Sequence, residues 1–343
     1  MARFYSAVIK LPLGKRSRSA TPLGWQAGSV AASCWLYILA LVAFWLYLRF
    51  EGDRTTTGAL IQFSPRWLAL LPLIVLIPLA AIANRSSLLL LTAGTWIALF
   101  PVMDLCLPWR SLLSSSISHG SFRVLSCNVH SHAADRRKLS DLIAATNPDI
   151  VCLQEWPSDQ TREVFSSPDW YIANLGALCI ASRYEIEAAA YLAPLDVIRC
   201  RIILPSGAIN FIDLHLSSPH KALSNTLRDV PEGPMALARN IQVRRIEAQN
   251  IAAIPPQLPG PTLLAGDFNL TTDSSIYRDN FSSYSDAFST AGLGFGWTYR
   301  IKWTATRIDH MLTDDRLICT HCEVCPNIGS PHRPLLAEFF VKF

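Results

Sequence analysis

Polar side chains that could do chemistry stand at the edges of short apolar runs in the second part of the chain. Most follow a stretch of aliphatic and β-branched residues, and the last precedes one. Polar groups from several strands placed in this way meet at one rim of a sheet, where a binding site can form. These residues are Asn128, Glu155, His215, Asp267 with Asn269, Asp309 and His332.

The types of these residues suit one chemistry. Carboxylate and amide oxygens are hard ligands, which suit Mg²⁺ or Mn²⁺ better than zinc. Such a cation neutralises phosphate charge, and histidines exchange protons near neutral pH. The sequence holds no GxxxxGK[ST] loop, no GxGxxG turn and no GxSxG elbow, so ATP, dinucleotide and serine-esterase chemistry are not indicated.

A sheet-rich domain must position these residues. Helical periodicity is clearest over 136–145, which ends before Asn147-Pro148, and over 236–254, which ends at Pro255-Pro256. Many strands with few helices predict an α/β domain over residues 121–343. The predicted strands are 122–129, 150–155, 177–182, 197–204, 208–216, 262–265, 307–313 and 335–341.

The first part of the chain has a different character. The whole chain is 50% hydrophobic and 16% charged, with a mean hydropathy of +0.26, which excludes a disordered or coiled-coil protein. Apolar runs at 29–48, 67–83 and 86–103 are close to the roughly 20 residues that cross a bilayer. The alternative is a set of core helices in a soluble domain. We expect about three transmembrane helices at 29–48, 67–83 and 86–107, within a membrane region at 1–107, and a linker at 108–120.

The charge balance bears on orientation. Residues 1–120 hold 10 Lys+Arg and 3 Asp+Glu, a net charge of +7. Residues 121–343 hold the other 20 Lys+Arg and 23 Asp+Glu, a net charge of −3. Every charged residue among the first 20 is basic, which favours a cytoplasmic N-terminus. Three crossings then place residues 121–343 outside the cytoplasm, and we expect an integral protein of a bacterial-type inner membrane.

The cysteines predict buried thiols rather than a disulfide framework, because the domain holds an odd number of them, several within apolar runs. Cys319, Cys322 and Cys325 form a C-x2-C-x2-C run, for which a metal site and a strand of small apolar residues are the two interpretations. The strand is favoured, and it would point Cys322 away from the other two.

Seven short motifs, in order, resemble one family. Residues 121–343 are similar to the endonuclease/exonuclease/phosphatase (DNase I-like) family, and the GDFN element together with the RID and HRP elements is specific for it. The resemblance implies a two-layer β-sandwich flanked by helices and metal-dependent hydrolysis of a phosphoester. The motifs are LSCNV, CLQEW, LCIASRY, DLHLSS, AGDFNL, RIDHML and SPHRPLLAEF.

The resemblance also implies roles for the polar residues. Glu155 is similar to the principal metal ligand of the family, and Asn128 to its neighbour in the metal or phosphate site. Asp267 matches the residue that holds or deprotonates the attacking water, and Asn269 the amide that binds phosphate. His215 is similar to the histidine that contacts the phosphate or assists the leaving group. Asp309 is similar to the carboxylate that orients the last histidine of the site, which is His332 here.

One position departs from the family, which usually reads Ser-Asp-His where this chain reads Ser330-Pro331-His332. Pro331 cannot ligate a metal, so we expect a single cation, Mg²⁺ or Mn²⁺, centred on Glu155. Asp213, two residues before His215 on the same strand face, is a candidate replacement for the missing aspartate. The leading hypothesis is a membrane-anchored phosphoesterase that uses in-line water attack. The alternative is a membrane-tethered binding domain of the same fold that has lost hydrolysis.

The substrate stays open between nucleic acid and a phospholipid or inositol phosphate, and no protein partner is inferable. Other polar residues have simpler interpretations. We expect His130 and His132 in a solvated loop, and His310 in packing. Trp297 and Tyr299 are assigned either to a substrate groove or to the core. Arg244 and Arg245 are expected on the wet face of their helix.

Overall fold

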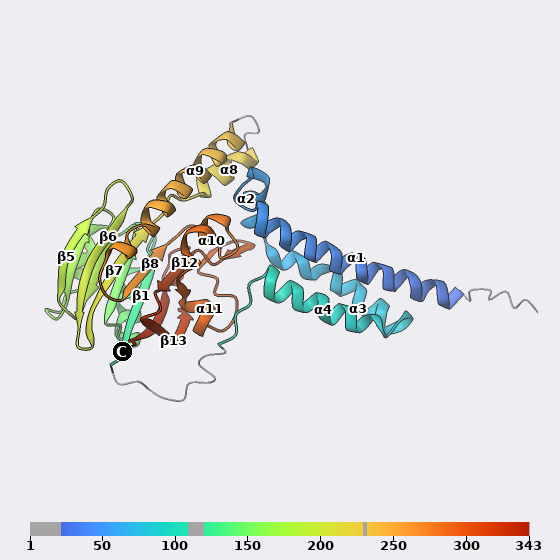
Figure 1. The fold of residues 1–343 in the computed structure, drawn as a ribbon, viewed down its shortest axis with the longest axis horizontal. Coiled ribbons are helices and arrows are strands. Elements are labelled where there is room, and N and C mark those ends of the chain that lie inside the picture. Colours follow the sequence, from blue (N-terminus) through green and yellow to red (C-terminus); the bar gives the residue numbers. More distant parts are fainter. Residues whose placement is uncertain (1–21, 109–119, 229–231, 343) are drawn as a thin grey trace, which may run out of the picture.

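The computed structural model describes residues 22–108, 120–228 and 232–342. The basic N-terminal tail and almost all of the predicted linker at 108–120 lie outside the described residues. Two bodies are visible in Figure 1: a group of long N-terminal helices, and a sheet-rich body that contains the rest of the chain.

The N-terminal helices lie side by side and share a small apolar core (Figure 1). Tyr37, Leu73 and Leu91 belong to that core, one from each of the three helices. The opposite faces are also apolar but uncovered, since Ile82 is 86% and Leu89 77% exposed. The elements are α1 (Pro22–Glu51), α2 (Thr56–Gln62), η1 (Arg66–Leu70), α3 (Leu71–Ala83), α4 (Ser87–Ile97) and the short π-helix η2 (Ala98–Val102).

Two of these helical segments are long and apolar enough to cross a membrane, Gln26–Glu51 and Arg66–Ala83. The third, Ser87–Val102, is shorter. Its last turn is a π-helix that contains Pro101, which lacks the N–H needed for regular helix bonding. The helix therefore ends before residue 107, the predicted boundary.

The strands of the described residues form two six-stranded sheets and a two-stranded hairpin. Each large sheet is mixed, because β1 pairs with β2 and β7 with β8 in parallel while the other neighbours are antiparallel. The first sheet has the order β13 (Leu317–Val324), β14 (Leu335–Val341), β1 (Phe122–Asn128), β2 (Ile150–Gln154), β4 (Leu178–Ser182) and β3 (Tyr171–Leu175). The second has the order β5 (Ile186–Tyr191), β6 (Val197–Leu204), β7 (Gly207–His215), β8 (Thr262–Asp267), β12 (Asp309–Thr313) and β9 (Ser285–Asp286). The hairpin is β10 (Tyr299–Ile301) with β11 (Thr304–Thr306).

The alternation of side chains along each strand builds four layers. Val124 and Cys152 of the first sheet and Phe211 of the second belong to the core between the sheets. The outer faces pack on helices, the first sheet on α6 (Arg136–Thr146) and the second on α9 (Gly233–Ala252) and α10 (Ser275–Phe281). Shorter elements complete the domain: η3 (Ser158–Gln160), α7 (Thr161–Val164), α8 (His220–Arg228), η4 (Pro255–Gln257) and α11 (Ala287–Ala291).

This arrangement confirms the predicted α/β class, a β-sandwich flanked by helices and preceded by apolar helices. The ends of helix α6 lie close to those predicted from the sequence, because local capping residues determine them. The Asp135 carboxylate accepts hydrogen bonds from the Arg137 and Lys138 N–H groups at its start, and Asn147 ends it in the left-handed region before Pro148.

All nine cysteines are buried free thiols. The run of three lies on and just after β13, as the strand interpretation predicts. The predicted orientation of Cys322 is wrong, however, because a bulge between Cys319 and His321 shifts the register. Cys322 therefore shares the inter-sheet core with Cys319, whereas Cys325 belongs to the core under α6.

Candidate active site

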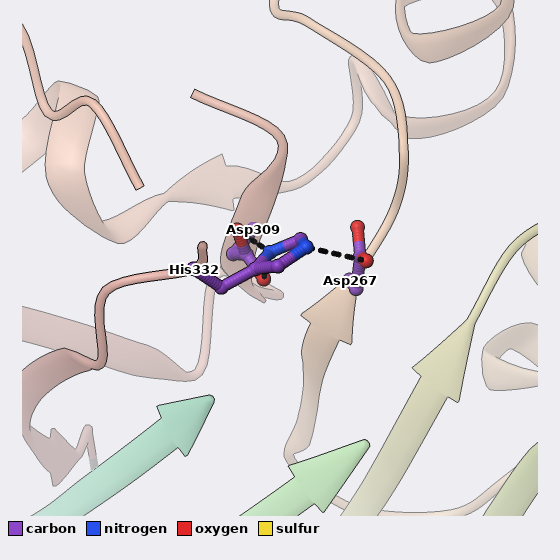
Figure 2. Close-up of side chains that lie close together, drawn as sticks. All are labelled: Asp267, Asp309 and His332. Carbon is purple, nitrogen blue, oxygen red and sulfur yellow. Dashed lines mark hydrogen bonds and ion pairs between the residues drawn. The ribbon is translucent and has the colours of Figure 1, made fainter. Parts of the chain in front are cut away.

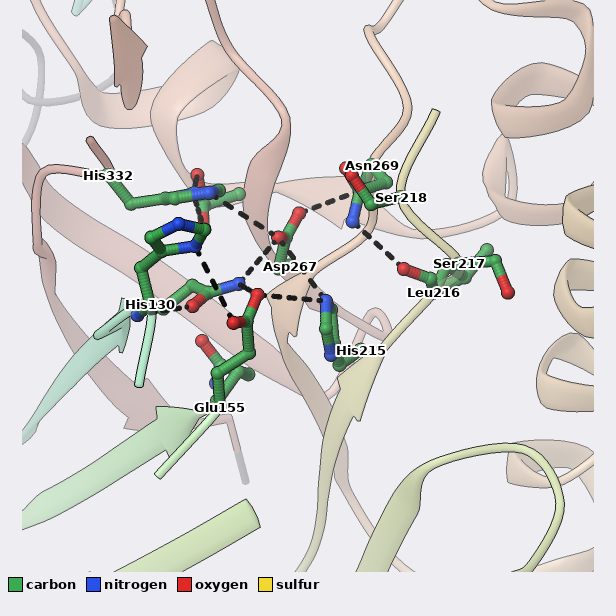
Figure 3. Close-up of polar contacts among 12 residues, drawn as sticks. His130, Glu155, His215, Leu216, Ser217, Ser218, Asp267, Asn269 and His332 are labelled. Atoms are coloured by element: carbon green, nitrogen blue, oxygen red, sulfur yellow. Dashed lines mark hydrogen bonds and ion pairs between the residues drawn. The ribbon is translucent and has the colours of Figure 1, made fainter. Parts of the chain in front are cut away.

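Strand register brings three predicted site residues into one row. His215 on β7 is paired with Asp267 on β8, and Asp267 is paired with Asp309 on β12. The three residues continue the inward-facing side of their strands, so their side chains lie at the rim of the sandwich, between the two sheets. From the opposite sheet, Asn128 at the end of β1 reaches the same place. Figure 3 shows Glu155, His215 and Asp267 turned toward one another there.

Asn128 ties the two sheets together at this rim. Its Nδ2 donates to Glu155 Oε1 and to Asp267 Oδ2, both at 3.0 Å, and its Oδ1 accepts from the His130 N–H at 2.8 Å. The Asn128 amide thus donates hydrogen bonds to both carboxylates through its nitrogen. A metal ion would be bound through the amide oxygen instead, so the role of Asn128 as a metal ligand stays a prediction.

Asp309 and His332 form a buried pair (Figure 2). Nδ1 of His332 lies 2.9 and 3.1 Å from the two carboxylate oxygens of Asp309, and Nε2 lies 3.7 Å from Asp267 Oδ2. The loop that carries His332 is anchored by Ser330, whose hydroxyl donates to the Asn128 carbonyl at 2.7 Å and accepts from the His332 N–H at 3.1 Å. The imidazole is therefore held with Nε2 facing Asp267.

His215 is oriented in the same manner by a residue that sequence analysis missed. Its Nδ1 lies 3.3 Å from Asp196 Oδ2, and its Nε2 lies 3.7 Å from Asp267 Oδ2 and 3.8 Å from Glu155 Oε1. This Nε2 is buried and has no hydrogen-bond partner among the described residues. Asp196 belongs to no motif, since it lies in the turn before β6.

The GDFN segment shapes the centre of the site. Gly266 has a φ of +137°, and a Cβ there would lie 2.1 Å from the Leu214 carbonyl oxygen on β7, so only glycine fits. Two residues after Asp267, the Asn269 N–H donates to Asp267 Oδ1 at 2.9 Å, and the Asn269 side-chain amide donates to the Leu216 carbonyl. These bonds fix the Asp267 carboxylate in the row.

The backbone around the site is strained. Glu155, Asn269, His130 and Asp196 all have φ between +49° and +50°, a left-handed conformation that side-chain-bearing residues rarely adopt. Each such residue costs on the order of 1–3 kcal/mol, and such residues cluster at functional sites. In each case a strand or loop turns sharply and delivers a polar group to the rim.

The electrostatics follow from crowding buried charges. Burial opposes protonation of both histidines, but nearby carboxylates outweigh it and raise the pKa of His215 and of His332 to about 9. Burial, reinforced by Asp309, raises the pKa of Asp267. The same negative surroundings add to burial in raising the pKa of Tyr299, whose ring packs edge-on against His332, to about 12.

The residues present fit a hard divalent cation. Asp267, Asp309 and His332 each offer a ligand atom within 4.8 Å of the others. Asp309 and Nδ1 of His332 already bond each other, however, whereas Glu155 lies beside Asp267 with its side chain 28% exposed. A cation that keeps several waters suits the Glu155 side better, and the unpartnered His215 Nε2 faces the same space.

A cavity of about 810 Å³ opens onto this cluster. Glu155, Asp267, Asn269 and His332 contribute to its lining. The site is thus an accessible hollow that contains carboxylates, amides and two oriented imidazoles, a set that can bind a phosphate group and activate water.

Residues 125–332 match the model of the endonuclease/exonuclease/phosphatase family. The chain belongs to this family. Its members are phosphoester hydrolases, which generally use divalent metal ions. No curated protein sequence matches the chain significantly.

Two solved structures show the same fold. One is a humanized D. rerio TDP2 with 14 mutations, with a TM-score of 0.51 and 14% identity over 64% of this chain and 98% of that chain. The other is D. rerio TDP2 complexed with single strand DNA product, with a TM-score of 0.50, 14% identity and the same coverage of both chains. At this identity the likeness concerns the fold of the family.

Further polar residues lie at or near the site. His130 is in an exposed loop, as expected, but it also lines the cavity, with Nδ1 3.5 Å from Glu155 Oε2. Tyr299 lines the cavity too, which is the first of the two interpretations given for it. Arg244 was expected to be solvated, but it is 1% exposed and donates to the Asn269 carbonyl at 2.9 Å. Asp213 is fully buried beneath the site, where Gln154 donates to it at 2.6 Å.

The remaining expectations concern packing. His310 is buried, with Nδ1 2.8 Å from Asp286 Oδ2 and Nε2 2.9 Å from the Leu270 carbonyl oxygen. Trp297 stacks on Phe295 at a centroid distance of 4.7 Å and lines a different hollow.

Proposed function

We propose that the chain is a membrane-anchored, divalent-metal-dependent phosphoesterase. The observation that carries the proposal is the row of His215, Asp267 and Asp309, to which His332 adds a second imidazole that faces Asp267 at 3.7 Å. A carboxylate between two oriented imidazoles is suited to hold and deprotonate a water molecule for in-line attack on phosphorus.

Each residue has a role in this mechanism. Asp309 accepts a hydrogen bond from the Nδ1–H of His332 and fixes the orientation of the ring. Nε2 of His332 and the carboxylate of Asp267 then both contact the attacking water. His215, held by Asp196, faces the phosphoryl oxygens or the leaving oxygen, and Asn269 lines the phosphate subsite. Mg²⁺ or Mn²⁺ held by Glu155, with Asn128 beside it, supplies positive charge to the phosphoryl oxygens when bound.

Membrane anchoring is the second part of the proposal, with a membrane region at 1–107 and a catalytic domain at 121–343. Two long apolar helices support it, as do their uncovered apolar faces, because a soluble core helix would be mostly buried. With the shorter segment Ser87–Val102 as a third crossing, the basic N-terminal tail favours a catalytic domain outside the cytoplasm. Reporter fusions at the C-terminus test this orientation.

A binding domain without hydrolysis is the competing function, and Pro331 favours it. Turnover of bis(p-nitrophenyl) phosphate and p-nitrophenyl phosphate by the full chain, with Mg²⁺ or with EDTA, separates the two. A Mg²⁺-dependent rate that Asp267→Asn lowers at least 100-fold, and the exposed control Asp141→Asn keeps, supports the phosphoesterase. No turnover of either compound or of any natural phosphoester contradicts it.

A further inference from the structure

The cavity over the site has two chemically different ends. One end contains Glu155, Asp267 and His332, and the rest of the lining is mainly apolar, with Lys221, Ser224 and Thr304 among its polar members. The apolar side chains come from α2 and the residue after it, from α8, from β10 and from the residue before β12. They are Leu60, Phe63, Leu223, Leu227, Ile301 and Ile308. A phosphoester bound at the catalytic end therefore has an apolar channel beside it.

One wall of this channel belongs to the N-terminal helices. Leu60 lies on α2 and Phe63 just after it, between the two segments that are long enough to cross a membrane. The site of the catalytic domain is thus completed by the membrane region. Figure 1 shows α2 at the end of the helical group, next to α8.

Buried polar contacts clamp this wall to the catalytic domain. Before α2, the buried Asp53 carboxylate accepts hydrogen bonds from the Ser275 and Ile276 N–H groups at 2.9 and 3.1 Å, and from the Ser274 and Ser275 hydroxyls. After α2, Arg66 pairs with Asp273 at 2.9 Å. Both ends are therefore fixed to the same short segment, which makes the wall a built part of the site.

The opposite wall is an amphipathic helix. Leu223 and Leu227 on α8 are four residues apart, so they lie on one face, toward the cavity. No residue of α8 is buried, and Leu227 is 75% exposed. Lys221, on the same helix, also lines the cavity and gives it a cationic group for a phosphate.

Two tryptophans near the cavity indicate where it lies relative to a bilayer. Trp303, in the turn of the β10–β11 hairpin, is 75% exposed, and its carbonyl accepts a hydrogen bond from Trp67 Nε1 at 3.1 Å. Trp67 stands at the start of the second long apolar segment, and tryptophan favours the membrane–water interface. The same hairpin brings Ile301 to the cavity, which places the channel at the membrane surface.

We propose that the substrate is a phospholipid, whose phosphoester lies at Glu155, Asp267 and His332 and whose acyl chain lies between α2 and α8. The proposal rests on the proposed function and specifies its substrate. Water adds its oxygen to phosphorus, one P–O ester bond breaks, and the alcohol leaves with a proton, which balances the reaction. A nucleic acid fits less well, because it requires a groove rich in Lys and Arg, whereas Lys221 and three histidines, His130, His220 and His332, are the basic groups described in this lining.

The test compares chain length at constant phosphate chemistry. The full chain in detergent micelles with Mg²⁺ is given phosphatidylglycerol and phosphatidic acid, each with dioleoyl or dibutyryl chains, together with a single-stranded oligodeoxynucleotide. We expect kcat/KM for a dioleoyl lipid to exceed that for its dibutyryl analogue at least tenfold. Equal values, or a preference for the oligonucleotide, would overturn the phospholipid assignment.

Variants separate the cavity from simple partition into micelles. Phe63→Glu and Leu227→Glu place a charge in the channel and are expected to bring the dioleoyl to dibutyryl ratio close to one. Ile246→Glu, at an exposed position on α9 outside the cavity lining, keeps the wild-type ratio. If both channel variants also keep the wild-type ratio, the acyl chain of the lipid does not bind between α2 and α8, and the proposal is wrong.

The nitrophenyl esters, which carry no acyl chain, distinguish the two levels of failure. Their hydrolysis without any preference for chain length removes the phospholipid proposal and leaves the phosphoesterase intact. Failure of the wild-type protein to hydrolyse any phosphoester refutes the proposed function, and the substrate assignment with it.

Discussion

Asp309 contacts Nδ1 of His332 with both carboxylate oxygens, at 2.9 and 3.1 Å, in a pair shielded from solvent. The contact fixes which nitrogen of the ring points at Asp267. A buried carboxylate that holds an imidazole in one tautomer and orientation is the arrangement that proton-transferring enzymes use to position a catalytic histidine.

Removal of this contact should impair catalysis without unfolding the protein. We expect Asp309→Asn to lower kcat by about 10²–10⁴-fold, because the imidazole loses its orienting charge. His332→Ala should lower it to a similar extent. The double variant should be no worse than the more damaging single one, since the two residues act as a unit. Independent, multiplicative losses would contradict this coupling.

Asp196 should have a smaller effect through His215. It is more exposed than Asp309, with 29% of its side chain accessible, and its contact with the imidazole is longer, at 3.3 Å. We expect Asp196→Asn to lower kcat/KM about tenfold and His215→Ala about 100-fold. Asp141→Asn on the exposed face of α6 serves as the control. An Asp196→Asn effect as large as that of His215→Ala would mean that Asp196 itself contacts the substrate.

Metal dependence can be measured in two independent ways. EDTA should abolish turnover, and Mg²⁺ or Mn²⁺ should restore it. Glu155→Gln removes the charge of the predicted principal ligand and should raise the half-saturating metal concentration at least about tenfold. Electron paramagnetic resonance titration of Mn²⁺ reads binding without activity. Unchanged Mn²⁺ affinity in Glu155→Gln would move the cation to the Asp267, Asp309 and His332 group.

The sequence was sufficient for the layers of the sandwich and for the main polar cluster, because both depend on local patterns. Strands β1, β2, β6, β7, β8, β12 and β14 alternate between two apolar environments, and their ends carry the polar residues of the motifs. Strands β3 and β5 were not predicted. They lie at sheet edges, and their half-exposed residues lack a clear apolar alternation.

The missed contributors depend on tertiary position. Asp196 reaches the site because a turn with left-handed backbone precedes β6, which no local pattern shows. Arg244 had a readable signal, since Leu237, Ile241, Arg244 and Ala248 follow the spacing of one buried helix face. The α2 wall brings Leu60 beside residues more than 160 positions away, and only the fold reveals it.

Stability in acid should depend on Asp286. Burial opposes its charge, but Arg307, at 3.0 Å, and His310, at 2.8 Å, outweigh burial and hold the pKa of Asp286 well below its usual value. A carboxyl group whose folded-state pKa is lowered stabilises the fold above its unfolded pKa of about 4, and this contribution is lost as the pH falls below that value. The folded protein should therefore lose stability from about pH 4 downward, in part through this residue.

Asp286→Asn provides the test. At pH 7 the variant leaves the buried Arg307 without part of its charge compensation, so we expect a loss of about 3 kcal/mol and a Tm lower by several degrees. The difference from wild type should shrink as the pH is lowered below 4, because the Asp286 carboxyl group of the unfolded wild-type chain becomes protonated there while that of the folded protein stays ionised. Thermal denaturation of the full chain in detergent between pH 3 and 7 measures this, with the exposed Asp279→Asn as control. A difference that is constant with pH would show that Asp286 acts through packing rather than through its charge.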